Sequence, residues 1–229
     1  MREIVLDTET TGLDPAAGHR IVEIGCVELI NHLPTGKNFH RYLNPEREVP
    51  DEVVRIHGLT NGFLADKPLF AEIADEFLDF LAEDPLVIHN AEFDLKFLNA
   101  ELARLNKPAL PSARATDTVV MARRRFPGAQ ANLDALCRRF GIDNTHRDKH
   151  GALLDSELLA EVYLALIGGR EPGLQLGQGK TADLAVTAGS APVAVTRPFR
   201  APRPHAASPE EEAAHAAFIA KLKSPIWLS

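Results

Sequence analysis

Two carboxylates stand close together near the start of the chain, at Asp7 and Glu9. They follow the apolar run Ile4-Val5-Leu6, which is typical of a buried strand. Because side chains two residues apart on a strand point to the same face, both acids would lie together at the edge of a hydrophobic core. Unpaired carboxylates in such a place are costly, and a divalent cation offsets that cost. The pair therefore indicates either a metal site or an ordinary solvated strand end.

Further ionisable residues follow in a fixed order. Asp94 closes the string His89-Asn90-Ala91-Glu92-Phe93-Asp94, directly after a second apolar run at 86–88. Asp155 opens a helical pattern, and His150 stands five residues before it. Four carboxylates from three separate elements match the oxygen ligands that Mg²⁺ prefers.

The joint occurrence of Asp7, Glu9, Asp94, His150 and Asp155 resembles the DEDDh 3′–5′ exonuclease superfamily. Residues 1–170 are similar to the epsilon-type proofreading subunits of bacterial DNA polymerase III. The resemblance implies a ribonuclease H-like fold, in which helices flank a mixed sheet, and a 3′→5′ DNA exonuclease that uses two Mg²⁺ or Mn²⁺ ions. The residues alone, strands first and then strands alternating with helices, indicate only the α/β class.

The resemblance also implies roles for the five residues. Asp7 would bridge both ions, and Glu9 and Asp155 would complete the site of the nucleophilic water. Asp94 would support the second ion, directly or through water. His150 would be the general base, since an unperturbed imidazole titrates at about pH 6.5 and accepts a proton at neutral pH.

By the same resemblance, Asp7 and Glu9 would also bind the substrate, and four further positions match those that hold the substrate in the family. Glu52 and His57 correspond to residues that contact the terminal nucleotide. Thr10 would meet the terminal sugar, and Leu13 would wedge between the last bases, although a core position would also suit Leu13. His89 and Asn90 would either orient the site or be structural, and His146 is interpreted as a loop residue.

Composition restricts the class of protein. The 229-residue chain carries a net charge of −7, and residues 1–170 alone carry 19 basic and 27 acidic side chains. Phosphate neutralisation supplies most non-specific DNA affinity, so an acidic domain would bind DNA weakly by itself and suits delivery by a partner. No apolar run approaches the roughly 18 residues of a membrane span, and the first strand begins at residue 3, so we expect no signal peptide. Two cysteines in apolar surroundings indicate reduced core thiols, and hence a cytoplasmic protein. That the protein is bacterial is implied by the resemblance alone.

Hydrophobic periodicity predicts the order of the elements. Strands are expected at 3–8, 20–30, 39–43, 85–89 and from 116, and helices at 50–58, 60–64, 68–81, 92–105, 132–140 and 152–167. Within this frame the basic run Arg123-Arg124-Arg125 is interpreted as a solvated helix face in preference to a phosphate contact.

Residues 171–229 differ in character from the rest of the chain. Residues 171–207 are rich in Pro, Gly and Ala without periodicity, which predicts a flexible linker. Ser208-Pro209-Glu210-Glu211 has the residues of a helix start, followed by an apolar stripe and Trp227. An isolated helix this short is marginal, so residues 208–229 are predicted to bind a partner, by resemblance the polymerase catalytic (alpha) subunit. Docking on the chain's own first domain is the alternative.

Two rival functions remain open from the sequence. An RNA 3′-end trimming ribonuclease would use the same residues, and a scaffold for the polymerase would need none of them. The complete acidic set argues against the scaffold, and the long linker with its terminal helix favours a polymerase subunit. The peptide around Gln175 also resembles clamp-binding peptides weakly, because it lacks their bulky last residues.

Overall fold

The computed structural model describes residues 1–147, 149–169 and 207–221. The chain forms two units, Met1–Leu176 and Gly177–Ser229, and each is described by itself. Nearly all of the predicted linker, with Gln175, and also Trp227 lie outside the described residues. The proposed boundaries at 170 and 207 therefore stay predictions.

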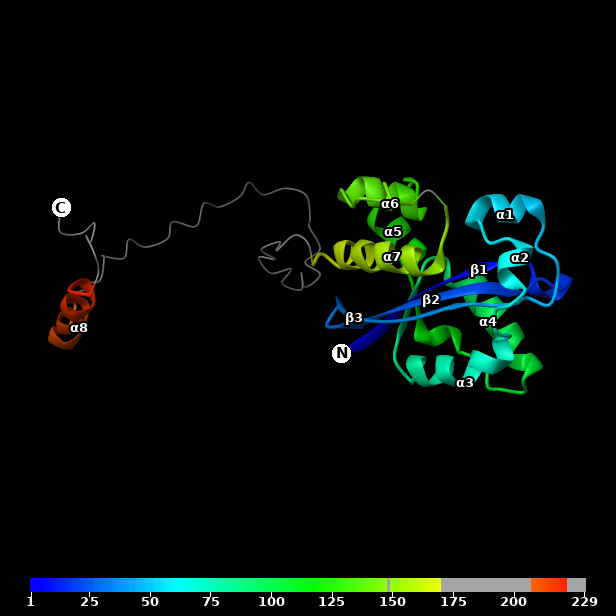
Figure 1. Ribbon diagram of the computed structural model, residues 1–229. Helices are drawn as coiled ribbons and strands as arrows, with labels where there is room; N and C mark the ends of the chain where they lie inside the picture. The colour runs from blue at the N-terminus through cyan, green and yellow to red at the C-terminus, as the bar shows by residue number, and fades with distance from the viewer. Residues whose placement is uncertain (148, 170–206, 222–229) are drawn as a thin grey trace, which may run out of the picture. The chain divides into compact units, whose positions relative to one another are not determined.

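Strands precede helices in the first unit and then alternate with them (Figure 1). The strands are β1 (Arg2–Thr10), β2 (Ile21–Ile30), β3 (Leu33–Tyr42), β4 (Leu86–Ile88) and β5 (Ala115–Asp117). The helices are α1 (Asp51–His57), α2 (Asn61–Leu64), α3 (Phe70–Leu81), α4 (Ala91–Arg104), α5 (Thr118–Arg125), α6 (Leu133–Phe140) and α7 (Ala152–Leu166), with short 3₁₀ turns η1 (Pro15–Ala17) and η2 (Ser112–Arg114). The second unit contributes α8 (Pro209–Ile219).

A single mixed sheet organises the first unit, with the strand order β3-β2-β1-β4-β5. β1 pairs antiparallel with β2 and parallel with β4, and β4 pairs parallel with β5. The predicted mixed sheet flanked by helices is confirmed.

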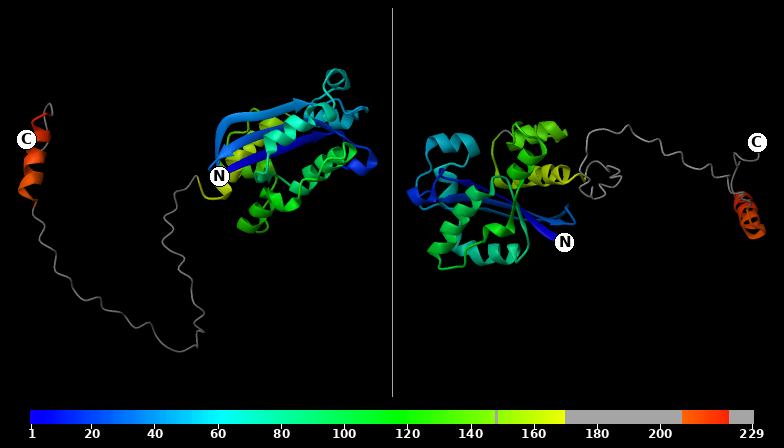
Figure 2. Two further views of the ribbon diagram at one scale, coloured as in Figure 1. Left: turned by 90° about the horizontal axis from the view of Figure 1, so that it is seen from below. Right: turned by 180° about the vertical axis from the view of Figure 1, so that it is seen from behind.

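Helices cover both faces of the sheet (Figures 1 and 2). Ile4 and Leu6 pack with residues of α3 and α4, whereas Val5 packs with residues of α6 and α7. Alternation along β1 is the cause, since successive side chains leave a strand on opposite faces. At the end of β1, Asp7 and Glu9 therefore share the face of Val5, which α7 covers.

The predicted third strand was too short. β3 begins at Leu33, six residues earlier than the expected start, and pairs with β2 through a two-residue connection at Asn31 and His32. Both connecting residues have positive φ, at 51° and 67°, as tight hairpins between twisted strands require. The first half of β3 is exposed and lacks hydrophobic alternation, so only its pairing with β2 makes it a strand.

Helix ends follow the local sequence. Asn132 caps α6, accepting a hydrogen bond from the Ala135 N–H, and Gly141 ends the helix with a left-handed φ of 64°, as predicted. The predicted start of α8 is also confirmed, because Ser208 and Glu211 form a reciprocal capping box there. The side chains of α8 are exposed along almost its whole length, and Phe218 is 58% exposed.

Both cysteines are buried and free, as expected. Among the described residues, no helix is both long and apolar enough to cross a membrane.

Candidate active site

The acidic pair of β1 lies where the strand leaves the core. Asp7 stands opposite Gly25 of β2, and Glu9 stands opposite Glu23, just before a register irregularity between Glu9 and Thr10. Both carboxylates are half-buried on the α7 face of the sheet. The same-face arrangement that the spacing predicted is therefore present.

Asp94 reaches the pair from the opposite helical layer. It lies in the first turn of α4 and is only 2% exposed. The Thr8 hydroxyl, which leaves β1 between the two acids, donates a 2.7 Å hydrogen bond to Asp94 Oδ1. Asp117 accepts hydrogen bonds from the N–H groups of Ala91 and Val119, so it fixes the starts of α4 and α5 together. Sequence reasoning missed Thr8 and Asp117, although Asp117 directly before a helical run carries the signal of an N-cap.

Asp155 comes from the first turn of α7, which lies very close to β2. A side chain at Gly25 would overlap the backbone of Ala152 and Leu153. The Ser156 hydroxyl donates to the Gly25 carbonyl at 2.9 Å. Because Gly25 is also the partner of Asp7, this close approach sets Asp155 beside the acids of β1.

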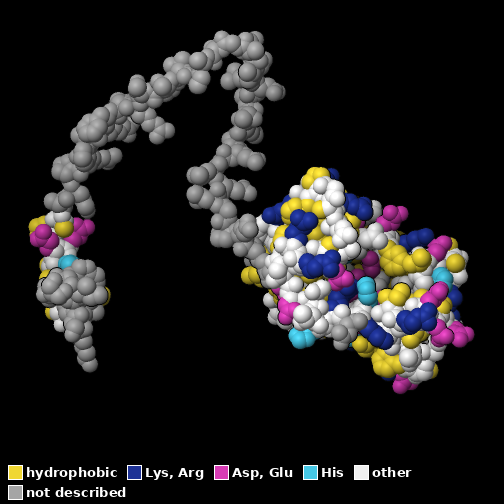
Figure 3. Space-filling model, turned by 90° about the horizontal axis from the view of Figure 1, so that it is seen from above, with side chains coloured by type: hydrophobic (Ala, Val, Ile, Leu, Met, Phe, Trp, Pro, Cys, Tyr) yellow, Lys and Arg dark blue, Asp and Glu magenta, His cyan; other side chains and the backbone are white. Residues whose placement is uncertain are grey.

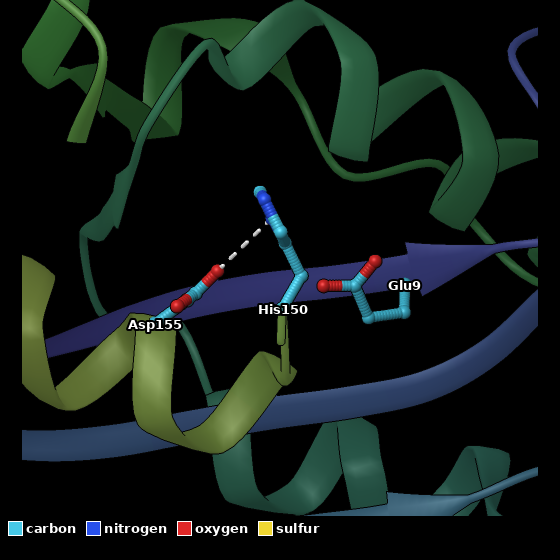
Figure 4. A group of neighbouring side chains, drawn as sticks. All are labelled: Glu9, His150 and Asp155. Carbon is cyan, nitrogen blue, oxygen red and sulfur yellow. Dashed lines mark ion pairs between the residues drawn. The ribbon is translucent and has the colours of Figure 1, made fainter. Parts of the chain in front are cut away.

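His150 lies on the loop directly before α7 and is half exposed. Its backbone N–H donates to the Ile56 carbonyl near the end of α1 (3.2 Å), and its ring Nδ1 lies 3.6 Å from Asp155 Oδ2. Glu9, His150 and Asp155 each place one ligand atom within 4.8 Å of the others, as their convergence in Figure 4 shows. The structure thus brings together all five residues of the predicted set.

Arg147 is the main residue that sequence reasoning missed. Its guanidinium donates to both oxygens of Asp155, with 2.6 Å between Nη2 and Oδ2, and to Asp134 Oδ1 at 2.9 Å. A third contact, 2.9 Å long, runs from Nη2 to Nδ1 of His150. A lone arginine in a polar loop carries no sequence signal for this position.

Burial dominates the electrostatics of the site, and repulsion between like charges adds to it. Burial, followed by repulsion from Asp94 and Glu9, raises the pKa of Asp7 well above its ordinary value. Burial and repulsion from Asp155 raise the pKa of Glu9 to about 8. Burial raises the pKa of Asp94 to about 7, against the opposing hydrogen bond from Thr8. These carboxylates lack sufficient positive charge from protein groups, so a divalent cation fits the site.

A cavity of about 930 Å³ opens above these residues. Its wall includes the predicted substrate residues Thr10, Leu13, Glu52 and His57, together with all five residues of the acidic set. In Figure 3 histidine, acidic and basic side chains adjoin hydrophobic ones around a hollow in the surface. The volume is that of a typical small-ligand pocket.

The predicted substrate residues differ in exposure. Leu13 is 83% exposed, so the alternative of a core position is wrong. Glu52 is exposed on α1, and the Thr10 hydroxyl already donates to the Gly12 carbonyl at 2.7 Å. His57 is buried, which lowers its pKa, and its Nδ1 accepts the Leu59 N–H. Its Nε2, near the Thr10 carbonyl, has no hydrogen bond of good geometry.

Sequence reasoning left other residues of the cavity unassigned. Ile56 and Phe93 line it beside Leu13, and Ile56 is 51% exposed. Both apolar side chains could contact a nucleic-acid base. The sequence carried a signal for them, because Ile56 precedes His57 and Phe93 precedes Asp94.

Four remaining predictions concern neighbouring polar residues. His89 Nδ1 lies 2.8 Å from the Thr118 hydroxyl, and Asn90 occupies the N-cap of α4 with a left-handed φ of 68°. His146 is exposed on its loop. Arg123, Arg124 and Arg125 are all exposed on α5, as a solvated helix face requires, and Arg125 also donates to the last carbonyls of α7.

Comparison with known proteins accords with this geometry. A model of the exonuclease family described as RNase_T matches residues 4–163. This chain belongs to that exonuclease family. It is 58% identical over 179 residues to the DNA polymerase III subunit epsilon of Rickettsia conorii, covering 77% of this chain and 78% of that protein. It is 48% identical over 188 residues to the subunit of the same name from Escherichia coli, covering 79% and 77%.

Solved exonuclease structures share the fold. Exonuclease X in complex with 5′ overhanging duplex DNA is 25% identical and superposes with a TM-score of 0.59, covering 73% of this chain and 92% of that one. The nuclease domain of 3′hExo, a DEDDh family member bound to rAMP, is 21% identical with a TM-score of 0.64, covering 72% and 91%. The exonuclease of this chain is therefore of the divalent-metal-dependent DEDDh kind.

Proposed function

We propose that this chain is the 3′→5′ exonuclease that proofreads for a replicative DNA polymerase of a bacterium. The observation that carries the proposal is the convergence of Asp7, Glu9, Asp94, Asp155 and His150 in one cavity. The relatives at 48–58% identity are named DNA polymerase III subunit epsilon, which supports the assignment to a polymerase.

The acidic set would hold two Mg²⁺ or Mn²⁺ ions, with Asp7 shared between them. Glu9 and Asp155 would complete one ion's ligands, and Asp94 those of the other. Bound cations supply charge neutralisation on the phosphate, activation of water and stabilisation of the leaving oxygen. His150, half exposed at the mouth of the cavity, takes the proton of the attacking water.

The apolar and polar walls of the cavity would hold the 3′-terminal nucleotide. Leu13, which is exposed on the wall of the cavity, would separate the last two bases. His57 would donate from Nε2, whose hydrogen bond is poorly formed without a ligand. Glu52 would also contact the terminal nucleotide, and Thr10 would meet its sugar. An uncompensated buried donor such as Nε2 of His57 is costly unless a ligand satisfies it.

The second unit would link the nuclease to its polymerase. The exposed helix α8 begins with a well-formed capping box, so it is ready to form on a binding surface. Residues 208–229 would bind the polymerase catalytic subunit. The peptide around Gln175 would contact the sliding clamp, an assignment that rests only on its weak resemblance to clamp-binding peptides. Because a replicative polymerase of a bacterium acts on DNA in the cytoplasm, we assign the protein to that compartment.

Digestion of 3′-labelled oligonucleotides tests the function. The purified full chain should release nucleoside monophosphates from single-stranded DNA, faster from a mismatched than from a matched 3′ end, and EDTA should stop the reaction. Asp7→Ala should lower the rate by several orders of magnitude, because both ions lose a ligand. Preference for an RNA strand over DNA would instead support the ribonuclease alternative, and activity that persists in EDTA would exclude the metal mechanism.

A further inference from the structure

Arg147 holds an unusual position inside the acidic site. It lies on the loop between α6 and α7, and its side chain is only 7% exposed. Among the described residues that line the cavity, it is the one lysine or arginine. Its guanidinium contacts Asp155, Asp134 and His150 at the same time.

The contact with Asp155 occupies both oxygens of a proposed metal ligand. Nε and Nη2 donate in parallel to Oδ1 and Oδ2, the two-pronged geometry in which arginine binds carboxylates most strongly. A divalent cation uses the oxygens of the same carboxylate. A guanidinium and a cation that both contacted Asp155 would also repel each other. Arg147 in this position and a cation on Asp155 therefore compete.

The contact with His150 occupies the proton acceptor of the proposed base. Arginine can only donate, so Nδ1 of His150 must be the acceptor of this 2.9 Å hydrogen bond. A neutral imidazole has one protonated nitrogen and one acceptor nitrogen. Its proton is then on Nε2, and neither nitrogen is free to take a proton from water. The same side chain thus blocks a metal ligand and the base.

We propose that Arg147 is an internal counter-ion that locks the metal-free site and is exchanged for the cation when the site is loaded. The proposal rests on the metal-dependent nuclease function proposed above. Asp134 gives the released guanidinium a place to remain, because it already accepts from Nη1 at 2.9 Å and is 47% exposed on α6. Release frees Asp155 and the Nδ1 of His150 in one movement, so metal loading and activation of the base are coupled.

NMR of the ¹⁵N-labelled full chain tests the exchange directly. The Nε–H resonance of Arg147 is assigned by its absence in Arg147→Lys, and Mg²⁺ is added without DNA. We expect this resonance to leave its paired position and approach that of a solvated arginine as the site saturates. An unmoved resonance at saturation, judged from the backbone amides of Asp7 and Glu9, would overturn the exchange. Amides of Asp7 and Glu9 that do not respond to Mg²⁺ would instead refute the metal site itself.

Cation affinity gives a second measurement, by calorimetric titration with Mn²⁺. Loss of a charge-assisted pair should tighten binding by about tenfold in Arg147→Gln. Arg147→Lys keeps the charge without the fork and should also bind tighter than the wild type. Wild-type affinity in both variants would overturn the proposal. Arg2→Gln is the matched control, because Arg2 pairs with Glu28 and Asp84 away from the cavity and its loss should leave Mn²⁺ affinity unchanged.

A double-variant cycle tests the role of Asp134. Asp134→Asn should weaken Mn²⁺ binding in the wild type, since the released guanidinium loses its second partner. In the Arg147→Gln background the same change should have no further effect, because Asp134 acts through Arg147. An equal weakening in both backgrounds would show plain electrostatics and would remove Asp134 from the mechanism.

Discussion

At the residue scale, the chemistry depends on one histidine among several. His150 is held beside Asp155 by the α7 start and by the hydrogen bond of its N–H to Ile56. His146 lies four residues earlier on the same loop, exposed and outside the lining of the cavity. Position, and not residue type, separates the proposed base from its neighbour.

His150→Ala should lower kcat by about two to four orders of magnitude, the usual contribution of a general base, with little change in KM for single-stranded DNA. Steady-state kinetics on a labelled oligonucleotide measures both constants. His146→Ala is the control and should keep the wild-type kcat. A wild-type rate in His150→Ala would place the base elsewhere.

The raised carboxylate pKa values predict how pH changes the stability of the metal-free protein. The pKa of Glu9 is raised to about 8 and that of Asp94 to about 7, whereas ordinary values near 4 hold in the unfolded chain. The folded state therefore binds more protons, so this stabilisation is complete below pH about 4 and is lost as the pH rises through about 7 to 8. In EDTA, Tm should fall between pH about 6 and pH about 9.

Mg²⁺ should reverse this loss, because it stabilises the ionised carboxylates in place of protons. The gain in Tm on adding Mg²⁺ should thus be larger at pH about 9 than at pH about 6, as thermal unfolding followed by circular dichroism can show. An equal gain at both pH values would contradict the crowding of charge inferred for the site.

At the element scale, the packing of α7 on β2 decides whether the site is assembled. The close approach depends on the missing side chain of Gly25, which would otherwise overlap the backbone of Ala152 and Leu153. α7 carries Asp155, and its preceding loop carries His150 and Arg147. A shift of this one helix therefore moves three residues of the site.

Gly25→Ala should destabilise the protein by about 1–3 kcal/mol, the usual cost of overpacking, and lower kcat by about a hundredfold through displacement of Asp155. Urea unfolding and the oligonucleotide assay measure the two effects. Gly62→Ala is the matched control: nothing lies within 4 Å of its added methyl group, so both quantities should stay near wild type. A fully active Gly25→Ala would show that α7 tolerates movement.

At the scale of the whole molecule, catalysis and delivery to DNA are assigned to different units. Deleting residues 208–229 should leave the digestion of free single strands unchanged while abolishing co-purification with the polymerase catalytic subunit. The physical reason is that α8 exposes its apolar side chains, which a partner can bury. Trp227→Ala should weaken the association alone, by about 2 kcal/mol or more for a buried interface tryptophan. Undiminished affinity of the truncated chain for the polymerase would refute this division.

The sequence by itself determined most of the elements, which depend on local rules, and its resemblance to a known family identified the members of the acidic set. Alternation along β1 places Asp7 and Glu9 on one face, and the caps at Asn132 and Ser208 begin their helices wherever the rest of the chain lies. Only the tertiary structure decided which groups neutralise these acids. The first half of β3 is a strand through pairing with β2, and Gly25 is essential through contact with α7. Arg147 reaches Asp134 and Asp155 because the fold brings the end of the loop after α6 to the wall of the cavity, and no local pattern records a contact that the whole fold creates.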